Sequence, residues 1–380
     1  MHEPISKAVL TYEILGVIIL ILVVIFWIFY REFKKRRDEE SHVPFKLNRL
    51  GDNPILSPRE HLLWEQIGVF NPAAILLGDN IHLLYRAVGG DGVSRIGYTT
   101  SKDGLNFSSG DTYPIFSFEK PRLLYRGVQK YDPVMYPSGG SCGGCEDPRL
   151  TVLDGVIYMT FNAFDGWDFI RIGLSMINEK DFLNKRWSAW SKPILLSPPG
   201  EIHKNWMLFP EKIDGKFAIL HSISPEIEIE YRDSISSIGI TEPFIESSTG
   251  ARSGGRKDEW DTRIRSAGPP PLKTEKGWLV LYHANQDTEP HKYKLGAKLL
   301  DINNPKKVIA QSILPMLEPD EWYENDSKPG IVYACGAITK EHDGKETLFV
   351  YYGGGDKYVC AAHAPLHDLL NWLVNYGSVN

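Results

Sequence analysis

The stretch Trp278-Leu-Val-Leu-Tyr-His283 is one copy of a pattern that recurs along the chain. It is a short apolar run that ends in an aromatic and a polar residue, and the turn signal Lys276-Gly277 precedes it. The other copies are Ile81-His-Leu-Leu-Tyr-Arg86, Val156-Ile-Tyr-Met-Thr-Phe161, Lys216-Phe-Ala-Ile-Leu-His221 and Thr347-Leu-Phe-Val-Tyr-Tyr352. Two of these copies, which end in Phe161 and Tyr352, lack the polar final residue.

These strands recur at intervals of about 60 to 75 residues, and several of them are followed by a second strand. Strand hairpins that repeat at such a period are typical of propeller blades. We therefore expect an all-β chain in which residues 48–380 form a five-bladed β-propeller. A pair of β-sandwiches with chance similarity between strands is the alternative.

The N-terminus contains an uncharged apolar run, ILGVIILILVVIFWIFY, at residues 14–30. A run of this kind predicts one transmembrane helix, at the short end of the length that a bilayer requires. Basic residues follow it at 31–37, so the positive-inside rule predicts a cytoplasmic catalytic domain and a single-pass membrane protein held in the lipid bilayer. The expected organisation is a tail at 1–13, the transmembrane helix at 14–30, a basic and polar linker at 31–47 and the propeller at 48–380.

Composition limits the other classes of function. The 380 residues are 42% hydrophobic, enough for a large core, and a net charge of -6 gives no reason to expect nucleic acid as a partner. Cys142 and Cys145 form a CxxC pair, but no second close pair accompanies it. We interpret these thiols as reduced and structural, and we predict no metal site.

The segment Cys142-Gly-Gly-Cys-Glu-Asp-Pro-Arg149 concentrates charged groups at a rigid corner. Pro148 fixes its own φ and restricts the residue before it, so the Asp147 side chain has a defined direction. A carboxyl group on a rigid corner beside a cation suits general acid catalysis. An ordinary Asp-Pro turn, with Arg149 in a surface ion pair, is the alternative that the segment by itself leaves open.

The propeller prediction places several polar side chains together. If the recurring strands are the inner strands, their ends converge on a central channel. Arg86, His221, His283 and Asp356 stand at or just after such ends, and Asp147 would join them. An axial pocket that combines an acid with several bases is the expected site.

An ordered set of motifs resembles glycoside hydrolase family 130, whose phosphorylases and hydrolases act mainly on β-mannosides. The motifs are Phe70-Asn-Pro72, Leu84-Tyr-Arg86, Arg95-Ile-Gly-Tyr98, Glu146-Asp-Pro-Arg149, Leu208-Phe-Pro-Glu-Lys212, Gly268-Pro-Pro-Pro271, Tyr282-His283 and Tyr352-Gly-Gly-Gly-Asp356. The resemblance covers roughly residues 48 to 374 and implies a five-bladed propeller.

The resemblance also implies roles for individual residues. Asp147 would be the general acid, and inorganic phosphate would be a co-substrate, with no cofactor. The substrate-binding residues would be Asn71, Arg86, Glu146, Arg149 and Asp356. The phosphate-binding residues would be Lys204, Arg263 or Arg265, and His283.

The chain departs from the family pattern at one corner. Leu220-His-Ser222 stands where the phosphorylases have Leu-His-Arg, so one expected phosphate ligand is missing. Nearby, residues 225–230 read PEIEIE and place three glutamates on one strand face. This run is either a solvated edge strand or, together with Glu246, a source of a catalytic base.

Three hypotheses therefore remain open. The first is an inverting phosphorylase that cleaves a β-mannoside with phosphate to give a mannose 1-phosphate. The second is an inverting hydrolase of the same glycosides, which needs a second carboxylate to activate water. The third is a membrane-tethered glycan-binding propeller without turnover. A basic pocket near Asp147 favours the first hypothesis, and an acidic one favours the second.

Overall fold

The computed structural model describes residues 44–118, 141–164, 170–247 and 254–378, together with residues 12, 15 and 17–32. The chain divides into two units, Met1–Pro44 and Phe45–Asn380. Most of the predicted tail at 1–13, and residues 33–43 of the predicted linker, lie outside the described residues.

The first unit corrects the membrane prediction. Its continuous helical stretch runs from residue 17 to residue 32. Among the described residues, no helix has both the length and the apolar character needed to cross a membrane. The predictions of a transmembrane helix at 14–30, a bilayer partner and a single-pass membrane localisation are therefore wrong.

The second unit consists mainly of strands, and those described fall into five antiparallel groups in chain order. The first group contains β2 (Gly68–Leu77), β3 (Asn80–Val88), β4 (Val93–Ser101) and β5 (Phe116–Ser117). The second contains β6 (Gly143–Leu153), β7 (Val156–Phe164), β8 (Ile170–Asn178) and β9 (Ile194–Leu195). The third contains β10 (Met207–Leu208), β11 (Phe217–Ile223) and β12 (Ile227–Arg232).

The fourth group contains β13 (Arg263–Ala267), β14 (Leu272–Thr274), β15 (Gly277–Gln286), β16 (Glu289–Leu300) and β17 (Val308–Gln311). The fifth contains β18 (Val332–His342), β19 (Lys345–Gly354) and β20 (Tyr358–Pro365). The short strand β1 (Asn48–Arg49) pairs with β20, so the start of this unit completes its last sheet. The helical elements are α3 (Glu179–Leu183), α4 (Leu366–Tyr376) and the 3-10 turns η1 (Trp187–Ala189) and η2 (Trp322–Glu324).

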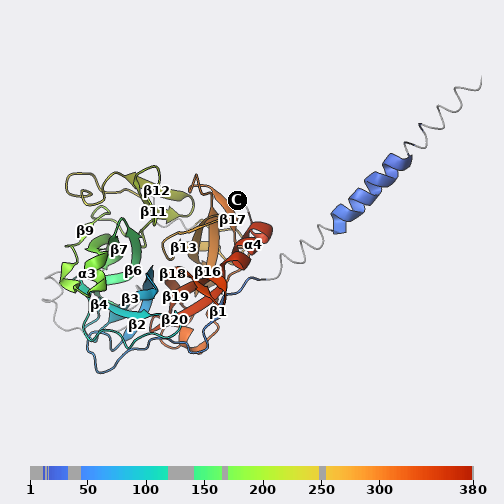
Figure 1. The fold of residues 1–380 in the computed structure, drawn as a ribbon. Helices are drawn as coiled ribbons and strands as arrows, with labels where there is room; N and C mark the ends of the chain where they lie inside the picture. Colours follow the sequence, from blue (N-terminus) through green and yellow to red (C-terminus); the bar gives the residue numbers. More distant parts are fainter. Residues whose placement is uncertain are drawn as a thin grey trace, which may run out of the picture. The chain divides into compact units, whose positions relative to one another are not determined.

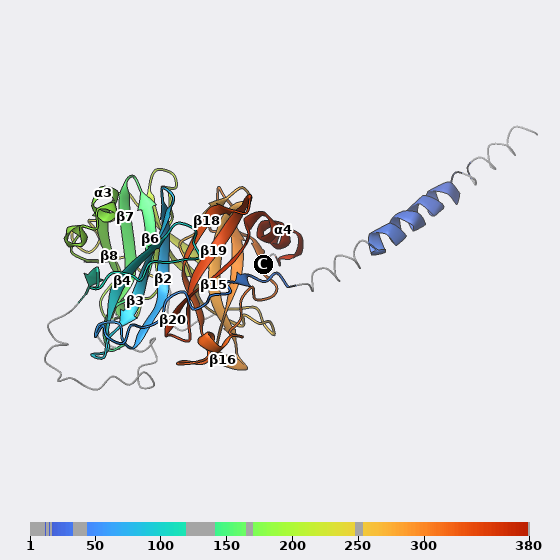
Figure 2. The same cartoon turned by 60° about the horizontal axis from the view of Figure 1, so that its bottom comes forward.

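These groups surround a common centre, as Figures 1 and 2 show, in a propeller-like arrangement. Neighbouring groups contact each other mainly through their first strands: β2 contacts both β6 and β18, and β6 contacts β10. A parallel pairing of β4 with β6, at Val93–Gly143 and Ser94–Gly144, joins the first two groups into one sheet. Buried apolar side chains fill the space between groups, for example Leu281, Leu295 and Val350.

The recurring strands of the sequence pattern are β3, β7, β11, β15 and β19, the second or a later strand of each group. The sequence pattern suggests that they are the innermost strands, but they are not. The innermost strands have a weaker apolar pattern because bulges or a proline interrupt several of them, and β10 has only two residues. The cysteines form no disulfide, and burial raises the pKa of the Cys145 thiol to about 12.

Candidate active site

Two neighbouring inner strands carry the same backbone irregularity, and it creates the centre of the site. The pairing of β2 with β3 shifts between Phe70 and Ala73, and that of β6 with β7 shifts between Glu146 and Arg149. In each bulge a polar residue precedes a proline and adopts a left-handed conformation, with φ of 48° at Asn71 and 49° at Asp147. Such bulges redirect side chains, and strained backbone of this kind concentrates at functional sites.

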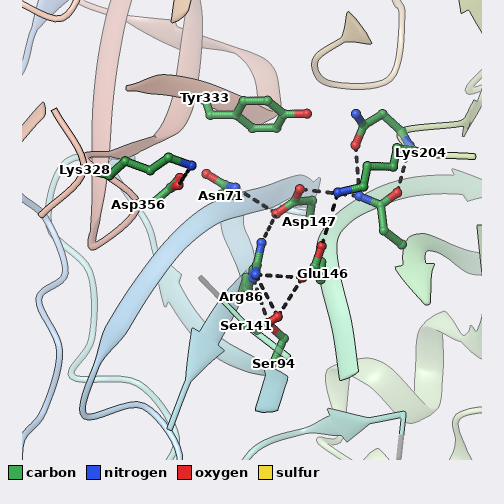
Figure 3. Close-up of polar contacts among 12 residues, drawn as sticks. Asn71, Arg86, Ser94, Ser141, Glu146, Asp147, Lys204, Lys328, Tyr333 and Asp356 are labelled. Carbon is green, nitrogen blue, oxygen red and sulfur yellow. Dashed lines mark hydrogen bonds and ion pairs between the residues drawn. The ribbon is translucent and has the colours of Figure 1, made fainter. Parts of the chain in front are cut away.

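The Asp147 carboxylate is almost fully buried and accepts several hydrogen bonds (Figure 3). Asn71 donates to Oδ1 at 2.7 Å, Arg86 donates to the same oxygen at 3.2 Å, and Asn162 donates to Oδ2 at 3.4 Å. Burial alone raises the pKa of Asp147, but the charges of Arg86 and Arg149 outweigh it. The pKa of Asp147 therefore lies below its ordinary value, and the group is ionised in the free site.

Arg86 connects Asp147 to a buried cluster beneath it. Its guanidinium donates to Glu146 Oε1 at 2.8 Å, to Ser141 Oγ at 3.0 Å and to Ser94 Oγ at 2.9 Å. Arg86 is 1% exposed and Glu146 is fully buried. Breaking a buried ion pair by removing one partner is costly, so Glu146 holds Arg86 in a fixed position.

Arg149 is buried rather than part of a surface ion pair. Its side chain donates to the carbonyl oxygens of Gly268, at 2.9 Å, and of Asp147, at 2.7 Å. These bonds connect the second group of strands to the fourth. Burial lowers the pKa of Arg149, but the acidic groups around it, including Asp147, raise it overall, so the guanidinium stays charged.

Asp356 reaches the site from the turn between β19 and β20. It also has a left-handed backbone, with φ of 51°, and it accepts a hydrogen bond from Lys328 at 3.0 Å. Gly353, three residues earlier, lies against Asn71, because a Cβ added there would meet Asn71 Oδ1 at 2.1 Å. Figure 3 shows Asn71 between Asp356 and Asp147.

A pocket that is open to solvent lies near Lys204, on the side of Asp147 away from Asp356. The residues that line it are Lys204, Asn205, Leu220, His221, Ser222, Ile223, Ser224, Ile264, Arg265, Ser266 and Ala267. The pocket is linked to Asp147 through Asn162, which also donates to Asn205 Oδ1 at 3.1 Å. Lys204 lies 3.8 Å from Glu146 Oε2. A lysine and an arginine thus line the pocket, together with three serines.

This pocket is not lined by Arg263, one of the two alternative arginines expected to bind phosphate, or by His283. Arg263 is exposed and forms an ion pair with Asp287. His283 is fully buried, and its Nε2 accepts a hydrogen bond from the backbone of Ala334 at 2.8 Å. Burial, reinforced by the charge of Arg149, lowers the pKa of His283 to about 3. His283 is therefore neutral and packs face to face on Tyr333, with ring centroids 4.0 Å apart.

The glutamate run at residues 225–230 does not line the pocket. Its residues from Ile227 onward belong to β12, the last strand of the third group, where Glu230 pairs with Arg232. Glu228 lies 3.4 Å from His221, behind the pocket lining, and Glu246 is exposed. Among the described residues that line the pocket, none carries a carboxylate.

Several residues of the site were not predicted from the sequence, namely Ser94, Ser141, Asn162, Asn205, Lys328 and Tyr333. For Asn162, the strand repeat contained a signal that could have predicted its place in the site. It pairs with Glu146 as Arg86 pairs with Phe70, so both residues occupy equivalent places in neighbouring groups. The recurring stretch that ends in Phe161 lacks a polar final residue, but Asn162 follows it directly and is the polar residue. Lys328 lies between strands and had no comparable signal.

The arrangement places the buried Asp147 carboxylate between two sets of polar side chains that differ in charge. On one side, Asn71, Asp356 and Lys328 offer donors and acceptors that suit sugar hydroxyls. On the other, Lys204 and Arg265 offer positive charge to an anion. A glycosyl group bound over Asp147 would have an anion site beside it.

Comparisons with known proteins identify relatives of this chain. The family model described as beta-1,4-mannooligosaccharide phosphorylase, of glycoside hydrolase family 130, matches residues 57–375. A 1,2-beta-oligomannan phosphorylase of Thermoanaerobacter sp. (strain X514) is 34% identical over 85% of this chain and 99% of its own length. A beta-1,2-mannobiose phosphorylase of the same strain is 33% identical over 84% of this chain and 97% of its own.

Solved structures agree as well. The beta-1,2-mannobiose phosphorylase of Listeria innocua, in complex with beta-1,2-mannobiose, has a TM-score of 0.63 and 25% sequence identity to this chain. The match covers 86% of this chain and 99% of that one. The resemblance inferred from the motifs is thereby confirmed.

Proposed function

Because the chain belongs to glycoside hydrolase family 130, we propose that it is an inverting phosphorylase of β-1,2-linked mannosides. The chain is an enzyme that acts on glycosides. The proposed reaction transfers a mannosyl group from the glycoside to inorganic phosphate. Inversion at the anomeric carbon converts the β-linkage into an α-mannose 1-phosphate and releases the remaining sugar. The β-1,2 linkage is taken from the relatives that match most of the chain.

The pocket beside Asp147 is the observation that carries the proposal. An inverting hydrolase needs a second carboxylate that activates water. The described residues that line this pocket contain none, and they include Lys204 and Arg265 instead. A phosphate dianion needs cations and hydrogen-bond donors rather than a base, because it is itself the nucleophile. The lining therefore supports phosphate over water.

In the proposed step, a phosphate oxygen forms a bond to the anomeric carbon while the glycosidic bond breaks. The electron pair of that bond stays on the leaving oxygen, and Asp147 supplies its proton. The attacking hydrogen phosphate ion loses its own proton, which replaces the one that Asp147 gives up, so atoms and charge balance over the cycle. Asn71, Arg86 and Asp356 would hold the mannosyl group over Asp147, and Glu146 would hold Arg86.

The low pKa of Asp147 in the free site has a consequence for this step. A general acid must carry a proton, and positive charge from Arg86 and Arg149 opposes protonation. The charge of Lys204, which lines the pocket, also lowers the pKa of Asp147, and phosphate bound in the pocket would partly cancel that effect. Asp147 would therefore gain acidic function in the complex that contains both substrates.

The test is to incubate the purified protein with β-1,2-mannobiose in the presence and absence of phosphate. We expect mannose 1-phosphate and mannose in equal amounts when phosphate is present, and no cleavage without it. Phosphorus and proton NMR should identify the α-anomer. Free mannose released at the same rate without phosphate would support the hydrolase alternative. That alternative arises because Ser222 stands where the phosphorylases have an arginine.

A further inference from the structure

A lysine outside the family motifs reaches the sugar end of the site. Lys328 donates from Nζ to Asp356 Oδ2 at 3.0 Å (Figure 3). The pair lies on the Asn71 side of Asp147, away from Lys204. Burial lowers the pKa of Lys328, but the Asp356 carboxylate raises it overall, so the ammonium stays charged.

The backbone of Lys328 is attached to the turn that carries Asp356. The Lys328 amide donates to the carbonyl oxygen of Gly355 at 2.9 Å, and the Gly355 amide donates to that of Ile331 at 3.1 Å. The lysine and the aspartate are thus held together through main-chain bonds as well as through their side chains. An ordinary surface ion pair has no such support and contributes little.

A buried ion pair fixes the segment that precedes Lys328. Glu324, at the end of η2, is fully buried and accepts two hydrogen bonds of 2.9 Å from Arg49. Tyr352 donates to it as well, at 2.8 Å. Arg49 belongs to β1, so the strand that completes the fifth group also positions this segment. Lys328 is therefore placed before any substrate arrives.

We propose that Lys328 binds the mannosyl group, with its ammonium and the Asp356 carboxylate contacting neighbouring hydroxyl groups of that sugar. A hydroxyl both donates and accepts, so adjacent hydroxyls can satisfy an ammonium and a carboxylate at once. The left-handed backbone of Asp356 and the attached segment support a built contact rather than an incidental pair. This inference rests on the proposed function, because it concerns the sugar of that reaction.

The test measures sugar binding separately from turnover. Calorimetry with β-1,2-mannobiose in the absence of phosphate should show an affinity about 10- to 100-fold lower for Lys328→Met than for the wild type, as expected for a lost hydrogen bond to a charged group. Lys328→Arg should recover part of the loss. In kinetics, the KM for the glycoside should rise while the KM for phosphate stays unchanged.

Lys357→Met is the matched control. Lys357 is adjacent to Asp356 in the chain, but it pairs with Asp326 at 2.7 Å on the surface. Sugar affinity of Lys328→Met within about twofold of that control would overturn the proposal. A wild type that binds the disaccharide but shows no phosphorolysis would instead contradict the proposed function, and the binding comparison would still decide the role of Lys328.

Discussion

The amide of Asn71 donates a 2.7 Å hydrogen bond to the carboxylate of Asp147, and the two residues occupy equivalent bulges in adjacent inner strands. Each precedes a proline and has a left-handed backbone. The repeat of the fold has thus produced two copies of one local structure, and one copy orients the carboxylate of the other. Such support keeps a catalytic group in place because its rotamer is fixed by a rigid neighbour.

Replacing Asp147 with asparagine should remove turnover and preserve sugar binding. The carboxamide retains the shape and can still accept the hydrogen bond from Asn71, but it has no proton to give. We expect kcat to fall by about 10²- to 10⁴-fold, with the affinity for β-1,2-mannobiose changed only a few-fold. Asp154→Asn is the control, because Asp154 also has a positive φ but sits in an exposed turn. A variant at position 147 that keeps near-normal kcat would exclude Asp147 as the acid.

The stability of the protein at acid pH should depend on Asp147. The pKa of this carboxyl is lowered in the folded state relative to its ordinary value of 3.8. Its contribution to the free energy of unfolding is therefore present above that value and is lost as the pH falls through the folded pKa. Urea unfolding at about pH 6 and about pH 3 should show a steeper loss for the wild type than for Asp147→Asn. Equal slopes would contradict the assigned charge environment.

Phosphate use should distinguish two arginines that lie two positions apart. Both arginines are exposed, but Arg265 lines the pocket and Arg263 pairs with Asp287. We expect Arg265→Ala to raise the KM for phosphate by about 10- to 100-fold, since it removes a charge-assisted contact to the anion. Arg263→Ala should leave that KM unchanged and serves as the control. The proposed anion site would be wrong if both variants behaved alike.

Lys204 should contribute to the same site, and Lys204→Met should raise the KM for phosphate by a similar factor. Its proximity to Glu146 gives this variant a second effect, because Glu146 also holds Arg86. A modest rise in the KM for the sugar is therefore expected as well. An unchanged phosphate dependence in steady-state kinetics would remove Lys204 from the site.

Ser222 offers a gain-of-function test. Its side chain lines the pocket and bonds to the backbone of Ser224. Ser222→Arg places a third permanent charge beside Lys204 and Arg265, so we expect a lower KM for phosphate. Ser236→Arg, at an exposed position, is the control for the added charge. A higher KM for phosphate in a folded Ser222→Arg variant would contradict this prediction, because it would show that the anion binds better beside serine.

The His283 imidazole should remain neutral across the working pH range. Its pKa is lowered to about 3, whereas an unfolded histidine titrates near 6.5. The unfolded state therefore binds more protons below pH 6.5, and stability should decline from there toward pH 3. Nitrogen-15 NMR of labelled histidine should show a neutral ring with the proton on Nδ1, because Nε2 accepts from Ala334. An imidazole that instead gains a proton near pH 6.5 would contradict this prediction and would allow a charged His283 to bind phosphate.

Local sequence was sufficient to predict the strands and the catalytic corner. Turn signals with glycine and aspartate mark the starts of the recurring strands, since few residues adopt the backbone angles of tight turns. Pro148 restricts the residue before it, although the left-handed backbone of Asn71 and Asp147 was not predicted. Asn71 was assigned to the site of Asp147 because their motifs resemble those of the family.

Other features depended on contacts that the sequence does not reveal. The apolar run at 14–30 resembled a membrane span, but the described helix is too short to be one. The sequence pattern predicts that the recurring strands are innermost, but in each group a less regular strand precedes them. His283 was predicted to bind phosphate because of its place in a motif, whereas its charge depends on burial by residues from other strand groups.

By itself, the sequence determined the strands, their turns, the rigid corner at Pro148 and the family. These depend on backbone preferences that act within a few residues. Only the tertiary structure decided which of Arg263 and Arg265 lines the pocket, that His283 is neutral, and that Lys328 meets Asp356. Those outcomes depend on burial and on partners far apart in the chain, such as Arg49 and Glu324, because desolvation and Coulomb interactions follow distance in space rather than in sequence.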